Sequence, residues 1–380
     1  MAAFDVVVVG LGAMGSAALY HLARRGRRVV GIERFYPGHD RGSSHGETRI
    51  IRLGYFEHPS YVPLVRAALQ LWRELEARSG RKLLDITGVI EIGAPNSVLI
   101  KGTLDASRQH ALTHDVLDAA TLMRRFPAFR VPPEFVGALQ PNGGFLMAEA
   151  AIHTLVGLAE AAGAQIRLGE TVREVKSRAG SARVETDRGS IDADTVVIAA
   201  GAWARSLLPA LPILRITRQV LAWFAPLDGA LFVRDRFPVF LLESPRGMHY
   251  GFPLFRNSGL KIAKHHHLDE TVDPDDYSRT LSTEDEAAIR DAIADYLPAA
   301  NGPLLSAKTC LYTMTSDGDF IVDRMPGEPQ IVIASPCSGH GFKFAPVLGA
   351  AVADLATVGT TSYDISRFRM NRFIPASMSR

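Results

Sequence analysis

The first thirty-four residues constrain the fold most, because they place a complete glycine motif between two apolar segments. Residues 4–9 form a short apolar run that predicts one buried strand, and the motif G-L-G-A-M-G follows at once at positions 10–15. We expect a helix over 17–25 and then a second strand over 28–32, which Glu33 closes. The order strand, glycines, helix, strand and acid is typical of a βαβ unit that binds a dinucleotide.

Each glycine of this motif has a separate physical role. Gly10 permits the tight turn, Gly12 lets the backbone approach a pyrophosphate, and Gly15 lets the helix pack on the strand. The unpaired N–H groups at the helix N-terminus then face the phosphates. Glu33 accepts hydrogen bonds from a ribose and, as an anion, disfavours a 2′-phosphate. The motif therefore predicts bound FAD or NAD.

Length, charge and cysteine content exclude several classes of protein. A chain of 380 residues is too long for one ordinary core, so two domains are expected. The net charge is only +2 and the basic residues are scattered, which argues against a nucleic-acid partner. No apolar run reaches the length of a membrane span. Cys310 and Cys337 are too few for a disulfide framework, and each taken alone is expected to be a small buried apolar residue. We expect a cytoplasmic protein with no membrane partner.

A second strand–glycine–helix unit stands near the other end of the chain. Residues 330–334 predict a buried strand, 338–341 a glycine turn and 344–355 a helix. A sheet assembled from both ends of a chain implies a cofactor domain with inserted segments, which is more typical of flavoproteins than of NAD dehydrogenases. The expected fold class is therefore α/β with a discontinuous domain. We assign residues 1–85, 145–215 and 305–380 to the FAD-binding domain, and residues 86–144 and 216–304 to a substrate domain.

The remaining pattern predicts the segments between these units. It indicates helices over 59–79 and 148–162, a strand over 86–92 with a bulge at Gly88, and helical pieces within 104–126. A helix that runs to Tyr296 is expected to begin at a capping box in which Thr283 is the cap and Glu286 reaches back.

Two arginines three residues apart, Arg49 and Arg52, lie in the segment 43–52. If this segment is helical, they fall on one face. An arginine pair in an apolar patch holds a carboxylate with bidentate geometry. The alternative is a structural salt bridge, which composition alone favours.

The segment 259–267 ends in three consecutive histidines. On a strand, Lys261 and His265 share one face. No metal site is expected, because alternation leaves only His265 and His267 on the same side and no cysteine or carboxylate pair has ligand spacing nearby. The basic run that begins at Lys264 either admits a second carboxylate or is solvated, and we expect it to be solvated.

Together these segments resemble the monomeric sarcosine oxidase and N-methyltryptophan oxidase family of amine-oxidising flavoproteins. The matching pieces follow the family's order in a chain of similar length. They are Gly10–Gly15 with Glu33, Thr48-Arg49-Ile50-Ile51-Arg52, Tyr250-Gly251-Phe252-Pro253, Lys261 with His265, Cys310-Leu311-Tyr312-Thr313, and Ser338-Gly339-His340-Gly341-Phe342-Lys343.

The resemblance implies an FAD-binding domain of the p-hydroxybenzoate hydroxylase type, with a mostly antiparallel sheet of the second domain over the flavin. It implies extended FAD joined by a thioether from Cys310 to the 8α-methyl group, and a substrate carboxylate held by Arg52 and Lys343. The lysine that matches Lys261 lies by the flavin and activates oxygen. The other catalytic and lining positions implied are Arg49, Tyr55, Tyr250, His265, Tyr312 and His340. The expected cofactor contacts are Gly10, Gly12, Gly15, Glu33, Arg34, Ser43, His45, Thr48, Gly201, Trp203, Cys310, Gly339, His340, Gly341 and Lys343.

The implied reaction oxidises a sarcosine-like N-methyl or cyclic secondary amino acid. A hydride passes to FAD, the imine hydrolyses, and O₂ is reduced to H₂O₂ by a monomeric enzyme. A buried substrate carboxylate must be paired, and two nearby cations lower the pKa of the substrate amine, so that the neutral amine reacts. The first one-electron transfer to oxygen makes superoxide, which a fixed cation at Lys261 stabilises.

Two features depart from the family pattern. Ser44 stands where the family often has a second histidine, and residues 226–248 show no clear family motif. The substrate therefore stays open between sarcosine, a larger N-methyl amino acid, a proline-like ring and an opine. The alternative functions are an FAD-dependent amine dehydrogenase with an acceptor other than O₂, and a non-catalytic flavin-binding subunit. Lys261 favours the oxidase.

Overall fold

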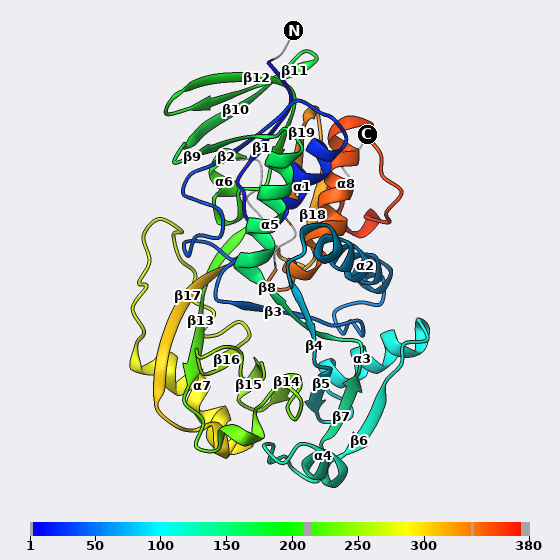
Figure 1. Cartoon of the computed structure of the whole chain (residues 1–380), viewed down its shortest axis with the longest axis vertical. Coiled ribbons are helices and arrows are strands. Elements are labelled where there is room, and N and C mark those ends of the chain that lie inside the picture. The colour runs from blue at the N-terminus through cyan, green and yellow to red at the C-terminus, as the bar shows by residue number, and fades with distance from the viewer. Residues whose placement is uncertain (1–2, 209–213, 336–337, 374–380) are drawn as a thin grey trace.

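Two large sheets with a small sheet between them form the framework of the molecule (Figure 1). The computed structural model describes residues 3–208, 214–335 and 338–373. The first sheet has the strand order β10-β11-β12-β1-β2-β9, with β19 and β18 beside the end of β12. Its strands are β1 (Phe4–Val9), β2 (Val29–Glu33), β9 (Gln165–Leu168), β10 (Val172–Arg178), β11 (Ser181–Thr186), β12 (Gly189–Ile198), β18 (Ile321–Met325) and β19 (Glu328–Ser335). The strands β9, β2, β1, β12 and β19 run parallel, which confirms a nucleotide-type sheet built from both ends of the chain.

Helices cover this sheet because the crossover connections carry apolar faces. The crossover helix α1 (Ala13–Arg24) joins β1 to β2 and contacts both α5 (Ala148–Ala161) and α8 (Ala345–Thr357), while α2 (Tyr61–Ser79) packs against α8. A Cβ on Gly349 would lie 2.5 Å from the Ala17 Cβ, so only glycine allows α8 to approach α1 this closely. Among the residues that the structure describes, no helix is long and apolar enough to cross a bilayer.

The second sheet is almost entirely antiparallel, and only the β14–β5 pair is parallel. Its order is β17-β13-β16-β15-β14-β5-β7-β6. The strands are β17 (Leu304–Met314), β13 (Arg215–Phe224), β16 (Leu260–Lys264), β15 (Gly247–Gly251), β14 (Val239–Ser244), β5 (Val89–Gly93), β7 (Val136–Gln140) and β6 (Asp115–Asp118). The helices α3 (Val98–Gln109), α4 (Ala119–Arg125) and α7 (Thr283–Tyr296) lie around it, and the short helix α6 (Ala204–Leu207) follows β12. The expected antiparallel sheet of the second domain is thus present.

The small sheet joins the two large ones and consists of β3 (Thr48–Ile51), β8 (Gly144–Met147) and β4 (Leu84–Ile86). Because β17 pairs with β13, the start of the segment 305–380 belongs to the second sheet and not to the nucleotide sheet. The proposed division into two domains stays a prediction at the level of its boundaries.

One local expectation was wrong, and two others need a structural qualification. The strand over 86–92 is broken at Gly88, whose φ of +76° separates β4 from β5 in different sheets. The segment 104–126 contains the strand β6 between its helices. The segment that carries Arg49 and Arg52 is extended, with Arg49 inside β3 and Arg52 just after it.

The capping box of α7 begins one residue earlier than expected. Ser282 Oγ accepts a hydrogen bond from the Asp285 N–H, and Asp285 Oδ2 accepts one from the Ser282 N–H. Asp285 turns back in place of Glu286 because its carboxylate also pairs with the Arg218 guanidinium, through contacts of 2.7 and 2.8 Å.

The basic run after β16 is not solvated throughout. His267 is 4% exposed, and its Nε2 donates to Asp285 Oδ1 over 2.8 Å, because an ionised carboxylate only accepts. Burial raises the pKa of Asp285, but the hydrogen bonds from Arg218, Ser282 and His267 outweigh it and hold the pKa below its usual value. This buried cluster attaches α7 to the second sheet.

We expect Asp285→Asn to lower the free energy of unfolding by about 3 kcal/mol, because it leaves the Arg218 charge buried without its partner. Urea denaturation followed by tryptophan fluorescence measures this change. The control is Asp291→Asn. Asp291 lies on the same helix as Asp285 and forms an exposed ion pair with Arg246, so this substitution should cost less than about 1 kcal/mol. Equal effects of the two substitutions would contradict the role of the cluster.

Candidate functional site

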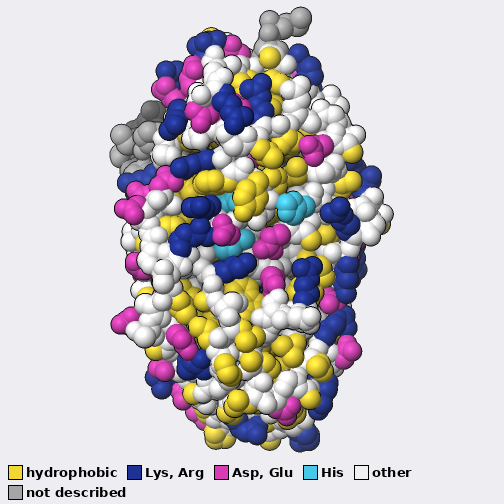
Figure 2. Space-filling view, turned by 60° about the vertical axis from the view of Figure 1, so that its left-hand side comes forward, with side chains coloured by type: hydrophobic (Ala, Val, Ile, Leu, Met, Phe, Trp, Pro, Cys, Tyr) yellow, Lys and Arg dark blue, Asp and Glu magenta, His cyan; other side chains and the backbone are white. Residues whose placement is uncertain are grey.

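A cavity of about 490 Å³ lies where the carboxyl ends of the parallel strands meet the second sheet. Residues of the glycine loop line one part of it, and residues of β14, β15 and β17 line the other. This is the position at which open α/β sheets bind ligands. On the face drawn in Figure 2, acidic and basic side chains are interspersed, in keeping with the nearly balanced charge of the chain.

The glycine loop exposes bare backbone to this cavity. Gly10 has a φ of +87°, and a Cβ on it would lie 2.7 Å from the Ala199 carbonyl oxygen. A Cβ on Gly15 would lie 1.7 Å from the Gly10 carbonyl oxygen, whereas one on Gly12 would meet only Ser44 Oγ, at 3.7 Å. The helix α1 begins directly after Gly12 without a side-chain cap. The Ala13 N–H makes a long contact of 3.4 Å with Ser44 Oγ, and the N-terminus of the helix still faces an anionic ligand in the cavity.

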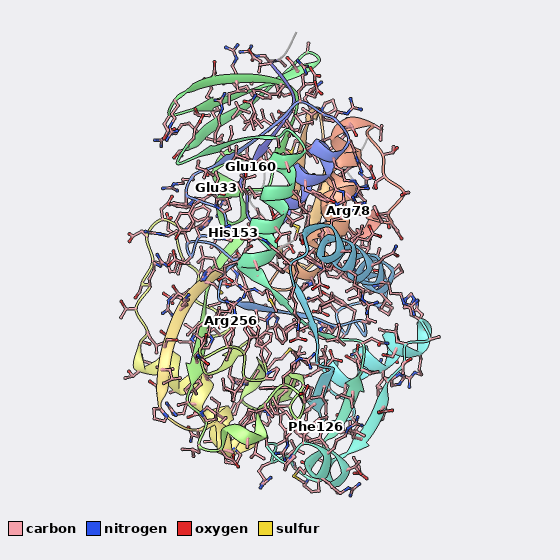
Figure 3. The ribbon with its side chains drawn as sticks, in the orientation of Figure 1. Glu33, Arg78, Phe126, His153, Glu160 and Arg256 are labelled. Atoms are coloured by element: carbon pink, nitrogen blue, oxygen red, sulfur yellow. The ribbon has the colours of Figure 1, made fainter. Side chains whose placement is uncertain are left out.

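Glu33 closes the glycine loop from the end of β2. Its two carboxylate oxygens accept hydrogen bonds from the Leu11 and Phe35 N–H groups, at 2.8 and 2.9 Å. The side chain is buried and lines the cavity, and in Figure 3 it lies beside α5, at a height between Glu160 and His153. This arrangement fixes a hydrogen-bond acceptor at the place where a ribose hydroxyl would donate.

Residues far apart in the sequence close the outer part of the cavity. Arg34 donates to Asp275 over 2.7 Å, and the Trp203 indole N–H donates to the same carboxylate over 3.0 Å. The Arg34 guanidinium also lies 5.8 Å from the Trp203 ring centroid. These contacts tie the loop after β2 to the segment before α7.

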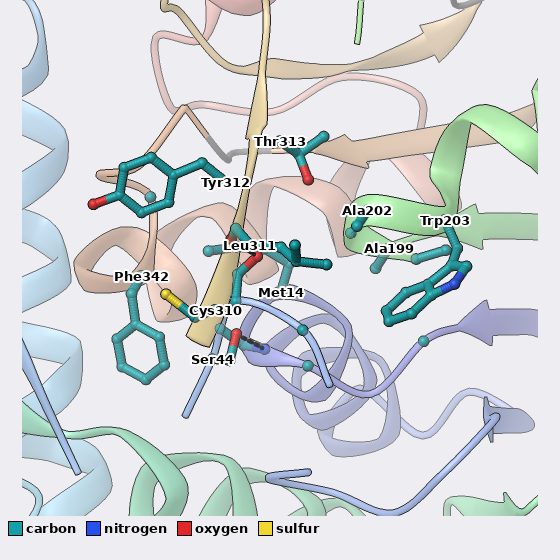
Figure 4. Close-up of a pocket in the computed structure, with 18 of the residues that line it drawn as sticks. Met14, Ser44, Ala199, Ala202, Trp203, Cys310, Leu311, Tyr312, Thr313 and Phe342 are labelled. Atoms are coloured by element: carbon teal, nitrogen blue, oxygen red, sulfur yellow. Dashed lines mark hydrogen bonds between the residues drawn. The ribbon is translucent and has the colours of Figure 1, made fainter. Parts of the chain in front are cut away.

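Cys310 lines the cavity from β17, where it lies opposite Gln219 of β13. Figure 4 shows its sulfur near Phe342 and Tyr312, with Ser44 accepting a hydrogen bond from the first turn of α1. Burial raises the pKa of the Cys310 thiol, although Arg49 and Lys261 act in the opposite direction. Ser44 thus contacts the start of α1 at the end of the glycine loop.

Lys261 on β16 is buried next to the cavity and has three hydrogen-bond acceptors. Its Nζ donates to the Gly46 and Thr48 carbonyl oxygens at 2.6 and 2.8 Å and to Thr48 Oγ1 at 3.2 Å. Burial, and then the Arg49 charge, lower the pKa of Lys261. Three acceptors nevertheless match the three N–H donors of an ammonium group and stabilise that form.

Arg52 is buried between two carboxylates. Its Nη2 donates to both Glu57 oxygens at 2.6 Å, and its Nε lies 3.6 Å from Glu91 Oε1. The guanidinium also lies over the Tyr55 and Phe56 rings. Burial raises the pKa of Glu57, but Arg52 outweighs it and lowers the value to about 2, so Glu57 stays ionised. The charge of Arg52 is therefore already balanced by Glu57 before a ligand carboxylate binds.

Lys343 is the second buried cation at this end. Its Nζ donates to the His340 carbonyl oxygen over 2.8 Å and lies 3.5 Å from Tyr55 Oη. His340 Nε2 lies 3.1 Å from the Gly318 carbonyl oxygen, so Nε2 carries the proton and Nδ1 accepts from Tyr55 over 2.6 Å. Burial and Arg52 lower the pKa of Lys343 to about 7.

The structure brings most of the predicted site residues together around one cavity. Those that line it are Gly10, Gly12, Glu33, Arg34, Ser43, Arg49, Arg52, Gly201, Trp203, Tyr250, His265, Cys310, Tyr312, Gly339, His340, Gly341 and Lys343. Gly15, His45, Thr48, Tyr55 and Lys261 lie behind this lining and are not part of it. His45 is buried, and burial and Arg49 lower its pKa to about 3, which keeps the ring neutral. Cys337 lies outside the described residues.

Sequence reasoning missed the acids around Arg52. Glu57 follows Arg52 by five positions and lines the cavity, and Glu91 lies in a strand that reads as apolar. Gln140 links Glu91 to the Arg52 segment, because its amide contacts both Glu91 and the backbone directly after Arg52. The isolated acid in an otherwise apolar run, Val89-Ile90-Glu91-Ile92, is the signal that would have pointed to Glu91.

Comparisons with known proteins agree with this geometry. The family model described as FAD dependent oxidoreductase (DAO) matches residues 5–355. Monomeric sarcosine oxidase of Bacillus sp. (strain B-0618) is 39% identical over 97% of this chain and 96% of its own length. N-methyl-L-tryptophan oxidase of Salmonella agona (strain SL483) is 37% identical over 97% of this chain and 99% of its own.

Solved structures show the same architecture. NikD, an unusual amino acid oxidase essential for nikkomycin biosynthesis, superposes with a TM-score of 0.85 at 29% identity, over 96% of this chain and 97% of its own. Glycine oxidase from Geobacillus kaustophilus superposes with a TM-score of 0.81 at 21% identity, over 98% of this chain and 99% of its own. The second match supports the fold alone.

Proposed function

The chain belongs to the DAO family of FAD-dependent oxidoreductases and, within it, to the monomeric sarcosine oxidase and N-methyltryptophan oxidase family, and on this premise we propose how its residues act. The protein is an FAD-dependent oxidase of N-methyl amino acids. One observation supports the roles that we assign to individual residues. A single cavity has a bare glycine loop at one end and the buried cations Arg52 and Lys343 at the other. The family also favours a cytoplasmic monomer.

The residues of the first part of the cavity fit FAD. The backbone at Gly12 and the first turn of α1 would hold the pyrophosphate, and Glu33 would hold the ribose. The Ser43 hydroxyl, which donates to the Leu311 carbonyl, joins this loop to β17 next to Cys310. When bound, FAD supplies the acceptor for a hydride from the carbon beside the substrate nitrogen.

Arg52 and Lys343 would bind and orient the substrate carboxylate. An isolated carboxylate in this buried position is very costly, and two cations with hydrogen-bond donors offset that cost. The same positive charges disfavour a protonated substrate amine, so they favour the neutral amine whose lone pair assists the reaction. Tyr55 keeps Lys343 in place through its contacts with His340 and Lys343 Nζ.

Lys261 would stabilise negative charge that develops on oxygen. Its Nζ is fixed by Gly46 and Thr48 on the small sheet, so the cation needs no reorganisation when O₂ is reduced. Phe252 and Trp223 flank the ammonium group, with centroids 4.7 and 5.6 Å away, and keep water from it. This placement favours an oxidase over a dehydrogenase.

The assignment is tested by anaerobic titration of the purified yellow protein with sarcosine, N-methyltryptophan, proline and an N-alkylated amino acid. We expect at least one N-methyl amino acid to bleach the flavin absorbance, and air to restore it with release of H₂O₂. If a compound bleaches the flavin but air does not restore its absorbance, the result would favour the dehydrogenase. If no compound bleaches the flavin, the result would contradict the substrate class.

Lys261→Met should slow the return of colour in air by about 100-fold or more, because the fixed cation is lost. Stopped-flow mixing measures flavin reduction and reoxidation separately, and flavin reduction should change by less than about tenfold. Lys264→Met is the matched control, since Lys264 lies on the same strand outside the cavity lining. An unchanged reoxidation rate in Lys261→Met would contradict the oxygen-activating role.

We further propose that Cys310 carries the flavin through a thioether to its 8α carbon, since Cys310 lines the cavity from β17, and the Ser43 contact with Leu311 joins that strand to the loop before β3. Acid precipitation of the wild type should leave the yellow flavin in the pellet, and Cys310→Ala should release it into the supernatant. Release from the wild type would show that the flavin is not covalently bound.

A further inference from the structure

A second acid lies behind the arginine assigned to the substrate carboxylate. Glu91 on β5 is fully buried, and its Oε1 lies 3.6 Å from Arg52 Nε. Its Oε2 accepts a hydrogen bond from Gln140 Nε2 over 2.8 Å. Gln140 Oε1 in turn accepts from the Leu53 and Gly54 N–H groups, which directly follow Arg52. Glu91 and Gln140 together therefore fix both the side chain and the backbone at Arg52.

Glu91 is not itself part of the cavity lining, whereas Arg52 and Glu57 are. Among the residues that the structure describes, the charged groups that act on its carboxylate are Arg52, Glu57 and Lys343. Its hydrogen-bond partner Gln140 and its neighbour Thr103 of α3 are neutral. Burial raises the pKa of Glu91 to about 7, although Arg52 opposes the rise. Its Oε1 has no hydrogen-bond donor within the described part of the chain.

Charge balance at this end of the cavity depends on whether Glu91 is ionised. Arg52 and Lys343 supply two positive charges, and Glu57 and Glu91 supply two negative ones. A bound ligand carboxylate adds a third negative charge, which destabilises the ionised form of each nearby acid. Glu57 stays ionised, because the Arg52 guanidinium donates to both of its oxygens. Glu91 makes only the longer contact with Arg52 and is the acid that can accept a proton.

We propose that Glu91 is a positioning residue for Arg52 that takes up a proton when a substrate carboxylate binds. This inference rests on the proposed function, because it requires that Arg52 and Lys343 hold the carboxylate. The ligand charge raises the pKa of Glu91 further, so carboxylate affinity is highest below pH 7 and falls as the pH rises above that value. The proton comes from solvent and neutralises the added charge.

The test is isothermal titration calorimetry of the FAD-loaded protein with methoxyacetate, an analogue of sarcosine with an ether oxygen in place of the amine. Its carboxylate is already ionised above pH 6, so any proton taken up belongs to the protein. Titrations at pH 7.5 in phosphate and in Tris, which differ in ionisation enthalpy, give the number of protons taken up. We expect at least about 0.3 proton per ligand in the wild type.

Glu91→Gln mimics the protonated acid, so proton uptake at pH 7.5 should fall well below the wild-type value, and the Kd should vary less between pH 6 and 9 than in the wild type. Glu91→Leu removes the ion-pair partner of Arg52 and the acceptor for Gln140, so the Kd for methoxyacetate should rise by about tenfold. Flavin reduction at saturating substrate should change little in Glu91→Leu, because Glu91 acts through Arg52. Asp85→Asn is the control, because Asp85 is a buried acid of the neighbouring strand β4 that pairs with Arg234 away from the cavity.

Lys343 is the competing source of proton uptake, since burial and Arg52 lower its pKa to about 7 as well. Uptake that persists unchanged in Glu91→Gln would therefore assign the proton to Lys343 and overturn the role of Glu91. That result would leave the carboxylate site intact. No binding of methoxyacetate by the wild type would contradict the carboxylate site, and this inference with it.

Discussion

The cost of burying charge determines how this cavity is built. Arg52, Lys261 and Lys343 are each almost fully buried, and a buried cation without partners is too costly to persist. Each is compensated differently: Arg52 by carboxylates, Lys261 by main-chain oxygens of the small sheet, and Lys343 by the His340 carbonyl. These partners come from segments far apart in the chain, so both large sheets and the small one must be in place for the site to exist.

The differences between the three cations divide their roles. Lys261 is bound by neutral oxygens, so none of its hydrogen-bond partners in the described part of the chain carries an opposing charge, while burial and Arg49 lower its pKa. Arg52 already has an ionised partner in Glu57. Its affinity for a substrate carboxylate therefore depends on whether the second nearby acid, Glu91, is ionised or protonated. Lys343 has only neutral hydrogen-bond partners in the described part of the chain. At the carboxylate end, burial brings the pKa values of Glu91 and Lys343 to about 7. The charge of this end is therefore expected to change with pH near neutrality.

Local patterns in the sequence predicted the nucleotide sheet and much of the site. The βαβ unit with Gly10, Gly12 and Glu33 depends on contacts within the first thirty-four residues, and these form as expected. Local pattern left Arg52 open between a carboxylate site and a structural salt bridge. The roles of Arg52, Lys261, Cys310 and Lys343 came from the resemblance to a family, because each lies on a different element. The structure places these residues in or directly behind one cavity. Their roles stay predictions.

Other features depend on tertiary contacts that no local pattern reveals. The run after Lys264 reads as solvated, but His267 is drawn inward by Asp285, which also moves the start of α7 by one residue. Glu91 and Gln140 act across two strands of the second sheet, and their sequence neighbours are apolar. The sequence predicts a bulge at Gly88 because the apolar pattern runs through it without a break. Only the structure shows that the strands on its two sides, β4 and β5, belong to different sheets.

The central claim is that one cavity holds a flavin at the glycine loop and a carboxylate at Arg52 and Lys343. A crystal structure of the FAD-loaded protein with methoxyacetate tests it most directly. The account predicts that both carboxylate oxygens lie within about 3.2 Å of nitrogen atoms of Arg52 and Lys343, with the flavin beside Cys310. A carboxylate bound elsewhere, with Arg52 still paired only to Glu57 and Glu91, would contradict it.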